Sequence, residues 1–201
     1  MVRIDRDRRR AAGTGSRALL TALLLLGSAV RADIATDVEQ HGDIDVAVIL
    51  DPAAQSGHAI GTVRIRARRE EVWLLIRSCA EAPKLLPGLV ACTVLRTAPD
   101  QSWQIIRHVL VYSWYLPTMT YEIRATYDKP ARISLERISG DLRVLKATWL
   151  LESDGDYTIA HYEVELAPGF WVPQWMVRYA LRHDLPKMLR ALRARAESAR
   201  H

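Results

Sequence analysis

The chain has 201 residues and a mass of 22.7 kDa, which favours one domain with a hydrophobic core large enough to fold without disulfides or metals. Hydrophobic residues make up 49% and charged residues 25%, and these values exclude a disordered chain, a collagen-like chain and a protein with several membrane spans. The net charge of +5 comes entirely from residues 1–32, where seven arginines face two aspartates. Because the remaining residues carry as many acidic as basic groups, composition gives no case for a nucleic-acid partner.

Residues 1–32 have the layout of a secretory signal peptide. An Arg-rich start precedes a 13-residue run without charge, from Ala18 to Val30, and Ala32 is a small residue suited to a cleavage site. The apolar run is short for a membrane span, which needs roughly 20 residues. We expect cleavage near Ala32 and an exported, periplasmic protein; an uncleaved anchor or an incorrectly assigned start is the alternative.

The two cysteines, Cys79 and Cys92, lie in the part that would be exported, with 12 residues between them. An even pair at short range in an oxidising compartment predicts a disulfide, and two buried thiols are the alternative. Without a CxxC spacing or a nearby histidine, the pair does not predict a metal site.

The first predicted elements follow a polar N-terminal extension, residues 33–56, in which the alternating stretch Asp45 to Leu50 predicts an edge strand. Alternation over residues 62–67 predicts a half-buried strand. Helical spacing then begins at Glu70 and continues to Ala80, and Pro83 begins a second short helix that ends at Pro87.

A run of strand-like segments separated by turn residues comes next: 90–96, 103–114, 118–127, 133–138, 142–151 and 157–166. Because no helical segment interrupts them, the sheet should be antiparallel with neighbouring strands joined in sequence. After Pro173, apolar residues recur at helical spacing from Leu181 to Ala196 and predict one long amphipathic helix.

This order predicts an α+β fold: a curved seven-stranded antiparallel sheet wrapped around a long C-terminal helix, with two short helices after the first strand. One helix cannot fill the concave face of such a sheet. A cavity between helix and sheet is therefore expected within residues 57–201.

The same pattern resembles the START-like, helix-grip superfamily of polyketide cyclase/dehydrase and lipid-transport proteins, and among them the bacterial coenzyme Q-binding type. The residues that carry the resemblance are distributed along the chain: Gly61, Val63, Ile65, Glu71, Val72, Trp73, Pro83, Pro87, Gly88, Leu89, Cys92, Val94, Leu95, Gly140, Asp141, Trp149, Tyr162, Pro168, Pro173, Leu185, Pro186, Leu189 and Glu197. The resemblance implies the fold and a cavity for a hydrophobic ligand, and it includes no catalytic signature.

Aromatic residues are the best candidates for the cavity wall, because tryptophan and tyrosine combine a large apolar ring with a polar group. The predicted lining residues are Trp73, Tyr112, Tyr121, Trp149, Tyr162 and Trp175. For each of them, ordinary core packing is the alternative.

No catalytic residue can be assigned from the sequence. His108 and His161 lie in predicted strands, where a satisfied or solvated side chain is the simpler interpretation. Glu122, Glu136, Glu163 and Glu165 are expected to point outward, and no motif indicates a nucleophile, a metal or a cofactor.

The C-terminal helix is basic, since residues 172–201 carry a net charge of +5. This face suits peripheral contact with an anionic membrane, although a solvated helix face would look the same. The sequence therefore predicts a carrier or sequestering protein for a lipid, isoprenoid, quinone or polyketide-like ligand. A cyclase, dehydratase or hydrolase acting in the same cavity, or a structural domain of the cell envelope, is the alternative.

Overall fold

The computed structural model describes residues 37–40, 44–51, 53, 55–112 and 117–199, so the predicted signal peptide lies outside the described residues. The elements in chain order are β1 (Asp37–Gln40), β2 (Ile44–Asp51), β3 (Ser56–Ile65), α1 (Arg69–Arg77), α2 (Ala82–Leu85), β4 (Leu89–Thr97), β5 (Trp103–Leu110), β6 (Met119–Asp128), β7 (Arg132–Gly140), β8 (Leu142–Asp154), β9 (Tyr157–Pro168) and α3 (Gln174–Ser198).

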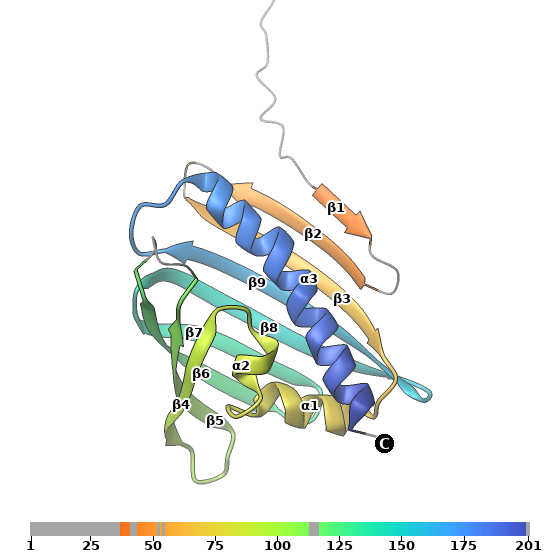
Figure 1. Cartoon of the computed structure of the whole chain (residues 1–201). Coiled ribbons are helices and arrows are strands. Elements are labelled where there is room, and N and C mark those ends of the chain that lie inside the picture. The colour runs from red at the N-terminus through yellow and green to blue at the C-terminus, as the bar shows by residue number, and fades with distance from the viewer. Residues whose placement is uncertain (1–36, 41–43, 52, 54, 113–116, 200–201) are drawn as a thin grey trace, which may run out of the picture. The chain divides into compact units, whose positions relative to one another are not determined.

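The strands form one antiparallel sheet in the order β1-β2-β3-β9-β8-β7-β6-β5-β4, which curves around α3 (Figure 1). From β4 to β9 each strand pairs with the next along the chain, as the short turns between them predict. The strand that precedes the short helices, β3, pairs with β9.

Within the described residues the sheet has nine strands, and the predicted number of seven is wrong. The two extra strands, β1 and β2, come from residues 33–56, where only one edge strand was expected. Alternation holds β2 in place: Ile44, Val46 and Val48 are buried in the main core, and the whole of β2 pairs with β3.

Helix α3 crosses the concave face of the sheet and packs over β2 and β3 (Figure 1). Two glycines of β3 allow this close approach. A Cβ atom at Gly57 would lie 2.3 Å from Cδ1 of Leu181, and one at Gly61 would lie 2.7 Å from Cδ1 of Leu189. The helix therefore rests almost directly on the backbone of β3.

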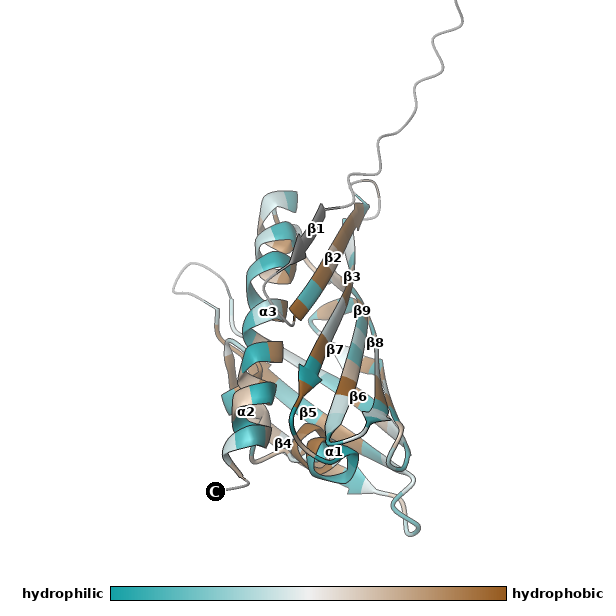
Figure 2. Ribbon diagram, turned by 90° about the vertical axis from the view of Figure 1, so that its right-hand side faces the viewer, coloured by the Kyte–Doolittle hydropathy of each residue, from teal (hydrophilic) through white to brown (hydrophobic). Residues whose placement is uncertain are grey.

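The apolar interior forms two clusters that meet beneath the helices. The larger one joins β2, β3, β8, β9, α1 and α3, and its fully buried members include Val63, Leu189 and Leu192. The smaller one lies under β4, β5 and β6 and includes Ile106, Tyr121 and Ile123. Figure 2 views the molecule from the side, with α3 forming a layer beside the sheet and hydrophobic residues coloured brown along strands such as β2 and β3.

The C-terminal end of α3 is tied to the short helices and to the end of β3. A guanidinium nitrogen of Arg195 lies 2.5 Å from the carboxylate of Glu81, which precedes α2. The backbone N–H of Arg66 donates to the carboxylate of Glu197 at 3.0 Å. These contacts fix this end of α3 to the start of α2 and to the end of β3.

The tight turn at Gly140 and Asp141 joins β7 to β8. It also holds the segment that leads from β9 to α3. The backbone N–H of Thr120 donates to the carboxylate of Asp141 at 2.7 Å, and the N–H of Gly169 donates to the carbonyl of Asp141 at 2.8 Å. Gly140 has φ +100°, and a Cβ there would lie 2.3 Å from the Thr120 carbonyl oxygen, so glycine is required at this position.

Candidate ligand-binding cavities

The larger cavity has a volume of about 450 Å³ and lies between the N-terminal half of α3 and the adjacent ends of β5, β6, β8 and β9. Its wall is apolar and aromatic, and none of the described residues that line it is charged. The residues used below are Tyr112, Tyr121, Phe170, Trp175, Met176 and Tyr179. A wall of this kind with few polar groups is typical of a site for a hydrophobic small molecule.

Exposed aromatic side chains stand at the margin of this cavity. Trp175 and Tyr179, which line it, are 62% and 54% exposed, and Trp171 is 74% exposed. Large aromatic rings are seldom left this open to water by a chain that has a core in which to bury them. The N-terminal end of α3 therefore presents a contact surface as well as a cavity wall.

The outer side of the same helix carries a basic groove of about 430 Å³. We call this the α3 groove; its lining consists of Trp175, Arg178, Tyr179, Arg182, His183, Pro186 and Arg190. Two of these residues, Trp175 and Tyr179, also line the larger cavity, so the apolar cavity and the basic groove share one wall.

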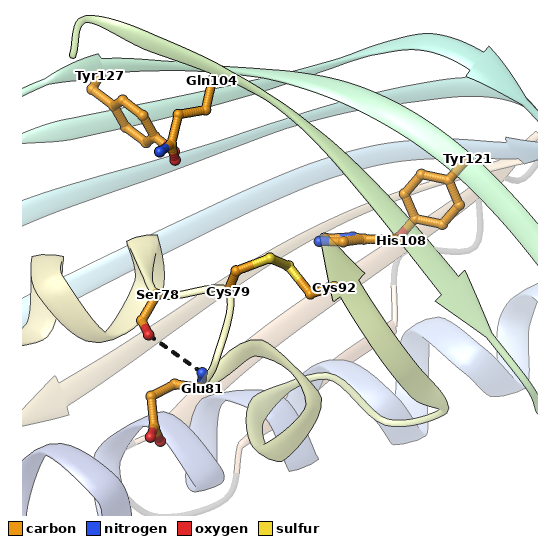
Figure 3. Close-up of a disulfide and its surroundings, with 8 residues drawn as sticks. All are labelled: Ser78, Cys79, Glu81, Cys92, Gln104, His108, Tyr121 and Tyr127. Atoms are coloured by element: carbon orange, nitrogen blue, oxygen red, sulfur yellow. Dashed lines mark hydrogen bonds between the residues drawn. A yellow bond between two sulfur atoms is a disulfide. The ribbon is translucent and has the colours of Figure 1, made fainter. Parts of the chain in front are cut away.

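A smaller cavity of about 90 Å³ lies deeper, between the C-terminal half of α3, the short helices and the sheet. The disulfide Cys79–Cys92 forms part of its wall and joins the loop between α1 and α2 to β4, with a Cα–Cα distance of 5.4 Å (Figure 3). The structure thus contains the disulfide that the sequence predicts.

His108 and Tyr121 share a hydrogen bond across the boundary between the two cavities. The Nδ1 atom of His108 lies 3.2 Å from the hydroxyl oxygen of Tyr121, and the rings meet edge to face (Figure 3). Tyr121 lines the larger cavity and His108 the smaller. Burial lowers the pKa of His108 to about 4, so the imidazole is neutral at pH 7, and burial also raises the pKa of Tyr121.

Five of the six predicted lining residues line one of these cavities. Tyr112, Tyr121 and Trp175 line the larger one. Trp149 and Tyr162 line the smaller one, where their ring centroids lie 4.4 Å apart.

Trp73 lines neither cavity, and this part of the prediction is corrected. It is only 2% exposed and packs edge to face against Tyr127, with ring centroids 5.9 Å apart. The reason is that the buried face of α1 is pressed into the main core beside α3, where a ring of this size fills the available space.

The other titratable strand residues lie away from the cavities. His161 is only partly buried, with its Nδ1 atom 3.0 Å from the hydroxyl of Thr62. Glu163 faces the outside of the sheet, where its carboxylate accepts a hydrogen bond from His58 at 2.8 Å. By contrast, Tyr112 lines the larger cavity, and its burial together with the nearby carboxylate of Asp184 raises the pKa of its hydroxyl.

The groups in the two cavity walls suit hydrogen bonding to a ligand. Among the described residues, the lining of neither cavity includes an aspartate or a glutamate, and the hydrogen-bond partner of His108 is a tyrosine. A general base needs a group that orients it and a reacting proton within reach. Across the described ranges no cluster of three metal-ligating side chains occurs.

The sequence indicates two features of this site only indirectly: the position of His108 and the position of Tyr179. His108 was interpreted as an ordinary strand histidine, although its position opposite Cys92 in the β4–β5 pairing places it beside the disulfide. Tyr179 was not singled out, although its spacing of four residues from Trp175 puts both rings on the same side of α3.

An antiparallel sheet that curves around one long helix and leaves a cavity between them defines the helix-grip class of START-like folds, as predicted. The family model for polyketide cyclase/dehydrase and lipid transport matches residues 65–193, more than half of the chain. The protein belongs to this family.

Solved structures with the same fold come from bacteria and from humans. The STAR-related lipid transfer protein from Xanthomonas axonopodis has a TM-score of 0.67 at 19% identity, and the match covers 80% of this chain and 98% of that one. The ZhuI aromatase/cyclase from Streptomyces sp. R1128 has a TM-score of 0.62 at 16% identity, covering 73% and 96%. The lipid transfer and protein localization domain of human StarD13 has a TM-score of 0.64 at 15% identity, covering 80% and 88%. A search of curated proteins gave no match.

Proposed function

We propose that this protein binds a hydrophobic small molecule in the larger cavity and carries or sequesters it. The observation that supports this most directly is the cavity of about 450 Å³ with an uncharged, aromatic wall and an exposed aromatic margin. Wall residues of a closed core would be packed against one another, whereas these leave space for a ligand. The likeness to lipid transfer proteins supports the same function.

The position of the α3 groove supports contact with an anionic membrane surface. Its cationic side chains suit lipid phosphates, and exposed tryptophan and tyrosine rings suit the interface between headgroups and acyl chains. Because Trp175 and Tyr179 belong to both the groove and the larger cavity, docking through the groove would bring the cavity next to the lipid. No helix among the described residues is long and apolar enough to span a membrane.

We propose that the protein carries out this function outside the cytoplasm. The Arg-rich leader of residues 1–32 supports export, and a disulfide in the cavity wall is suited to an oxidising compartment.

Native mass spectrometry of the purified protein, followed by solvent extraction, tests the binding function. We expect a stoichiometric hydrophobic molecule to be bound. Ala180→Phe places a ring in the larger cavity and should reduce occupancy at least tenfold, whereas Ala194→Phe, on an exposed position of the same helix, should leave it unchanged. An empty wild-type protein that also takes up no neutral lipophilic dye would contradict the proposal.

Sedimentation with vesicles tests the docking surface. The wild-type protein should bind phosphatidylcholine vesicles containing 30% phosphatidylglycerol, bind pure phosphatidylcholine vesicles weakly, and lose binding as salt is added. Arg178→Glu combined with Arg190→Glu should abolish binding, because both residues line the α3 groove. The charge-matched control, Arg96→Glu with Arg132→Glu, changes exposed sites on the sheet and should bind as the wild type does. Equal binding by both double variants would exclude the groove as the docking surface.

A further inference from the structure

We propose that His108 and Tyr162 form a polar anchor between the two cavities, which binds an uncharged oxygen within the skeleton of the ligand, such as the carbonyl of a ketone. This inference rests on the proposed function and specifies the class of molecule that the cavity takes. It concerns the interior of the protein and is independent of the docking surface on α3.

The anchor lies where the two cavities adjoin. The hydrogen bond of 3.2 Å between Nδ1 of His108 and the hydroxyl of Tyr121 connects the two walls. Tyr162 belongs to the same wall as His108, and its ring packs against Trp149. A ligand that extended from the larger cavity into the smaller one would pass this group of residues.

Two polar atoms at this position have unused hydrogen-bonding capacity. Because Nδ1 of His108 is engaged by Tyr121, only Nε2 is left, and among the described residues it has no hydrogen-bond partner. The Tyr162 hydroxyl likewise has none there. Neither atom belongs to the fully buried, unpartnered atoms of the described residues, so both are open to the cavity space.

The surrounding wall selects for an uncharged ligand. A neutral imidazole and a phenol offer hydrogen bonds without a net charge. Among the described residues, the charged side chain in the smaller wall is Arg77, whose guanidinium lies over the rings of Trp73 and Tyr127 and donates to Gln101 at 3.1 Å. A carboxylate or phosphate buried at the anchor would have to draw Arg77 away from these contacts to be neutralised, whereas a neutral oxygen needs no counter-ion.

The unequal volumes indicate where the oxygen sits in the ligand. The cavity on the outer side of the anchor has about 450 Å³ and the one behind it about 90 Å³. An oxygen held between them would divide the ligand into a long apolar part towards α3's exposed aromatic rings and a short part towards the disulfide. The site therefore suits a neutral molecule with an internal oxygen rather than an amphiphile with a terminal headgroup.

Competition against the neutral dye Nile red, on the full chain at pH 7, tests this inference with three matched compounds. These are 6-undecanone, 6-methylideneundecane, in which a methylene group replaces the carbonyl oxygen, and undecanoate. The wild-type protein should bind the ketone about three- to tenfold more tightly than the methylidene compound, which is the effect of one net hydrogen bond. Undecanoate should be the weakest of the three.

Two variants remove the anchor and one serves as a matched control. Tyr162→Phe removes a hydroxyl that has no protein partner within the described ranges, so the variant should fold as the wild type does. Both Tyr162→Phe and His108→Phe should reduce the preference for the ketone to less than twofold while leaving the affinity for 6-methylideneundecane unchanged. Tyr157→Phe removes a phenol hydroxyl on the outer surface, where the ring lies under Arg64, and should keep the full preference.

The outcomes separate this inference from the proposed function. If the wild-type protein binds ketone and methylidene compound equally, or if Tyr162→Phe keeps the full preference, the anchor is excluded although the cavity still binds hydrophobic molecules. If Nile red is not taken up at all, the proposed function fails together with the anchor.

Discussion

The two ends of α3 face the same sheet but are used differently. At the C-terminal end the helix is packed and fastened: Leu189, Leu192 and Ala196 are buried, and contacts from Glu81 and Glu197 hold it in place. At the N-terminal end it covers a cavity of about 450 Å³ and leaves aromatic rings in water.

This contrast shows how one helix can serve stability and binding together. At the end where α1, α2 and the disulfide meet α3, the helix buries Met188, Leu189, Leu192 and Ala196, whereas nearer its N-terminus it buries Val177 and Leu181 beside the cavity. The other end is attached by few polar contacts, among them the hydrogen bond from the side-chain amide of Gln174 to the Ser56 carbonyl at 3.3 Å. Because the packed end holds the fold, the open end can leave apolar surface available to a ligand.

Truncating one side chain at each end tests the contrast most strongly. Leu189→Ala removes a fully buried side chain and should reduce the free energy of unfolding by about 2–5 kcal/mol. Met176→Ala enlarges a cavity that is already open and should cost less than about 1 kcal/mol. Urea denaturation measures both, and equal losses would show that the two ends do not differ in this way.

Removing the disulfide should weaken the packed end without changing the open one. Replacing both Cys79 and Cys92 by alanine releases a short loop and should cost roughly 3 kcal/mol of unfolding free energy. The affinity of the larger cavity for Nile red should stay within twofold of the wild-type value, because the disulfide lines only the smaller cavity. A large loss of dye affinity in a folded variant would contradict this separation.

Acid should destabilise the folded protein through His108, which lies between the two cavities. The pKa of His108 is lowered from 6.5 to about 4 by burial, so the unfolded chain binds a proton in this range that the folded protein does not. Stability should therefore fall as the pH drops from about 6.5 to about 4, by at most about 3 kcal/mol, and this contribution should level off below pH 4.

Urea midpoints measured against pH for the wild type and for His108→Phe isolate this contribution. Burial raises the pKa of Asp184, which gives a pH dependence of opposite sign, but that group is present in both proteins. If the two curves run parallel between pH 4 and pH 6.5, the loss of stability does not come from His108.

Much of the fold follows from the sequence, because turn residues, the alternation typical of strands and the spacing typical of helices are all local signals. The hairpin at Gly140 and the long helix ending near Ala196 lie where they were predicted. The sequence predicts β2 only as an edge strand, because the residues on either side of it are polar and rich in turn residues. Its burial depends on α3, which lies more than 120 residues further along the chain, and a local pattern does not contain that contact.

The cavity walls were predicted with less success than the strands, since the sequence shows which side chains are aromatic but not which of them leave space. Trp73 and Trp149 look equivalent in the sequence, yet only Trp149 lines a cavity. The pairing of His108 with Tyr121 depends on the register of β5 against β6, which places these two residues opposite each other. That register is set by tertiary packing and could not be read from either strand alone.

The glycines beneath α3 have a consequence for redesign. Changing a wall residue such as Met176 alters the cavity locally, whereas Gly57 and Gly61 set the spacing between the helix and sheet layers. A methyl group at either position would meet Cδ1 of Leu181 or of Leu189, so that side chain would have to move away from β3. Substitutions at the two glycines therefore act on the contact between helix and sheet, whereas substitutions in the wall act on the shape of the cavity.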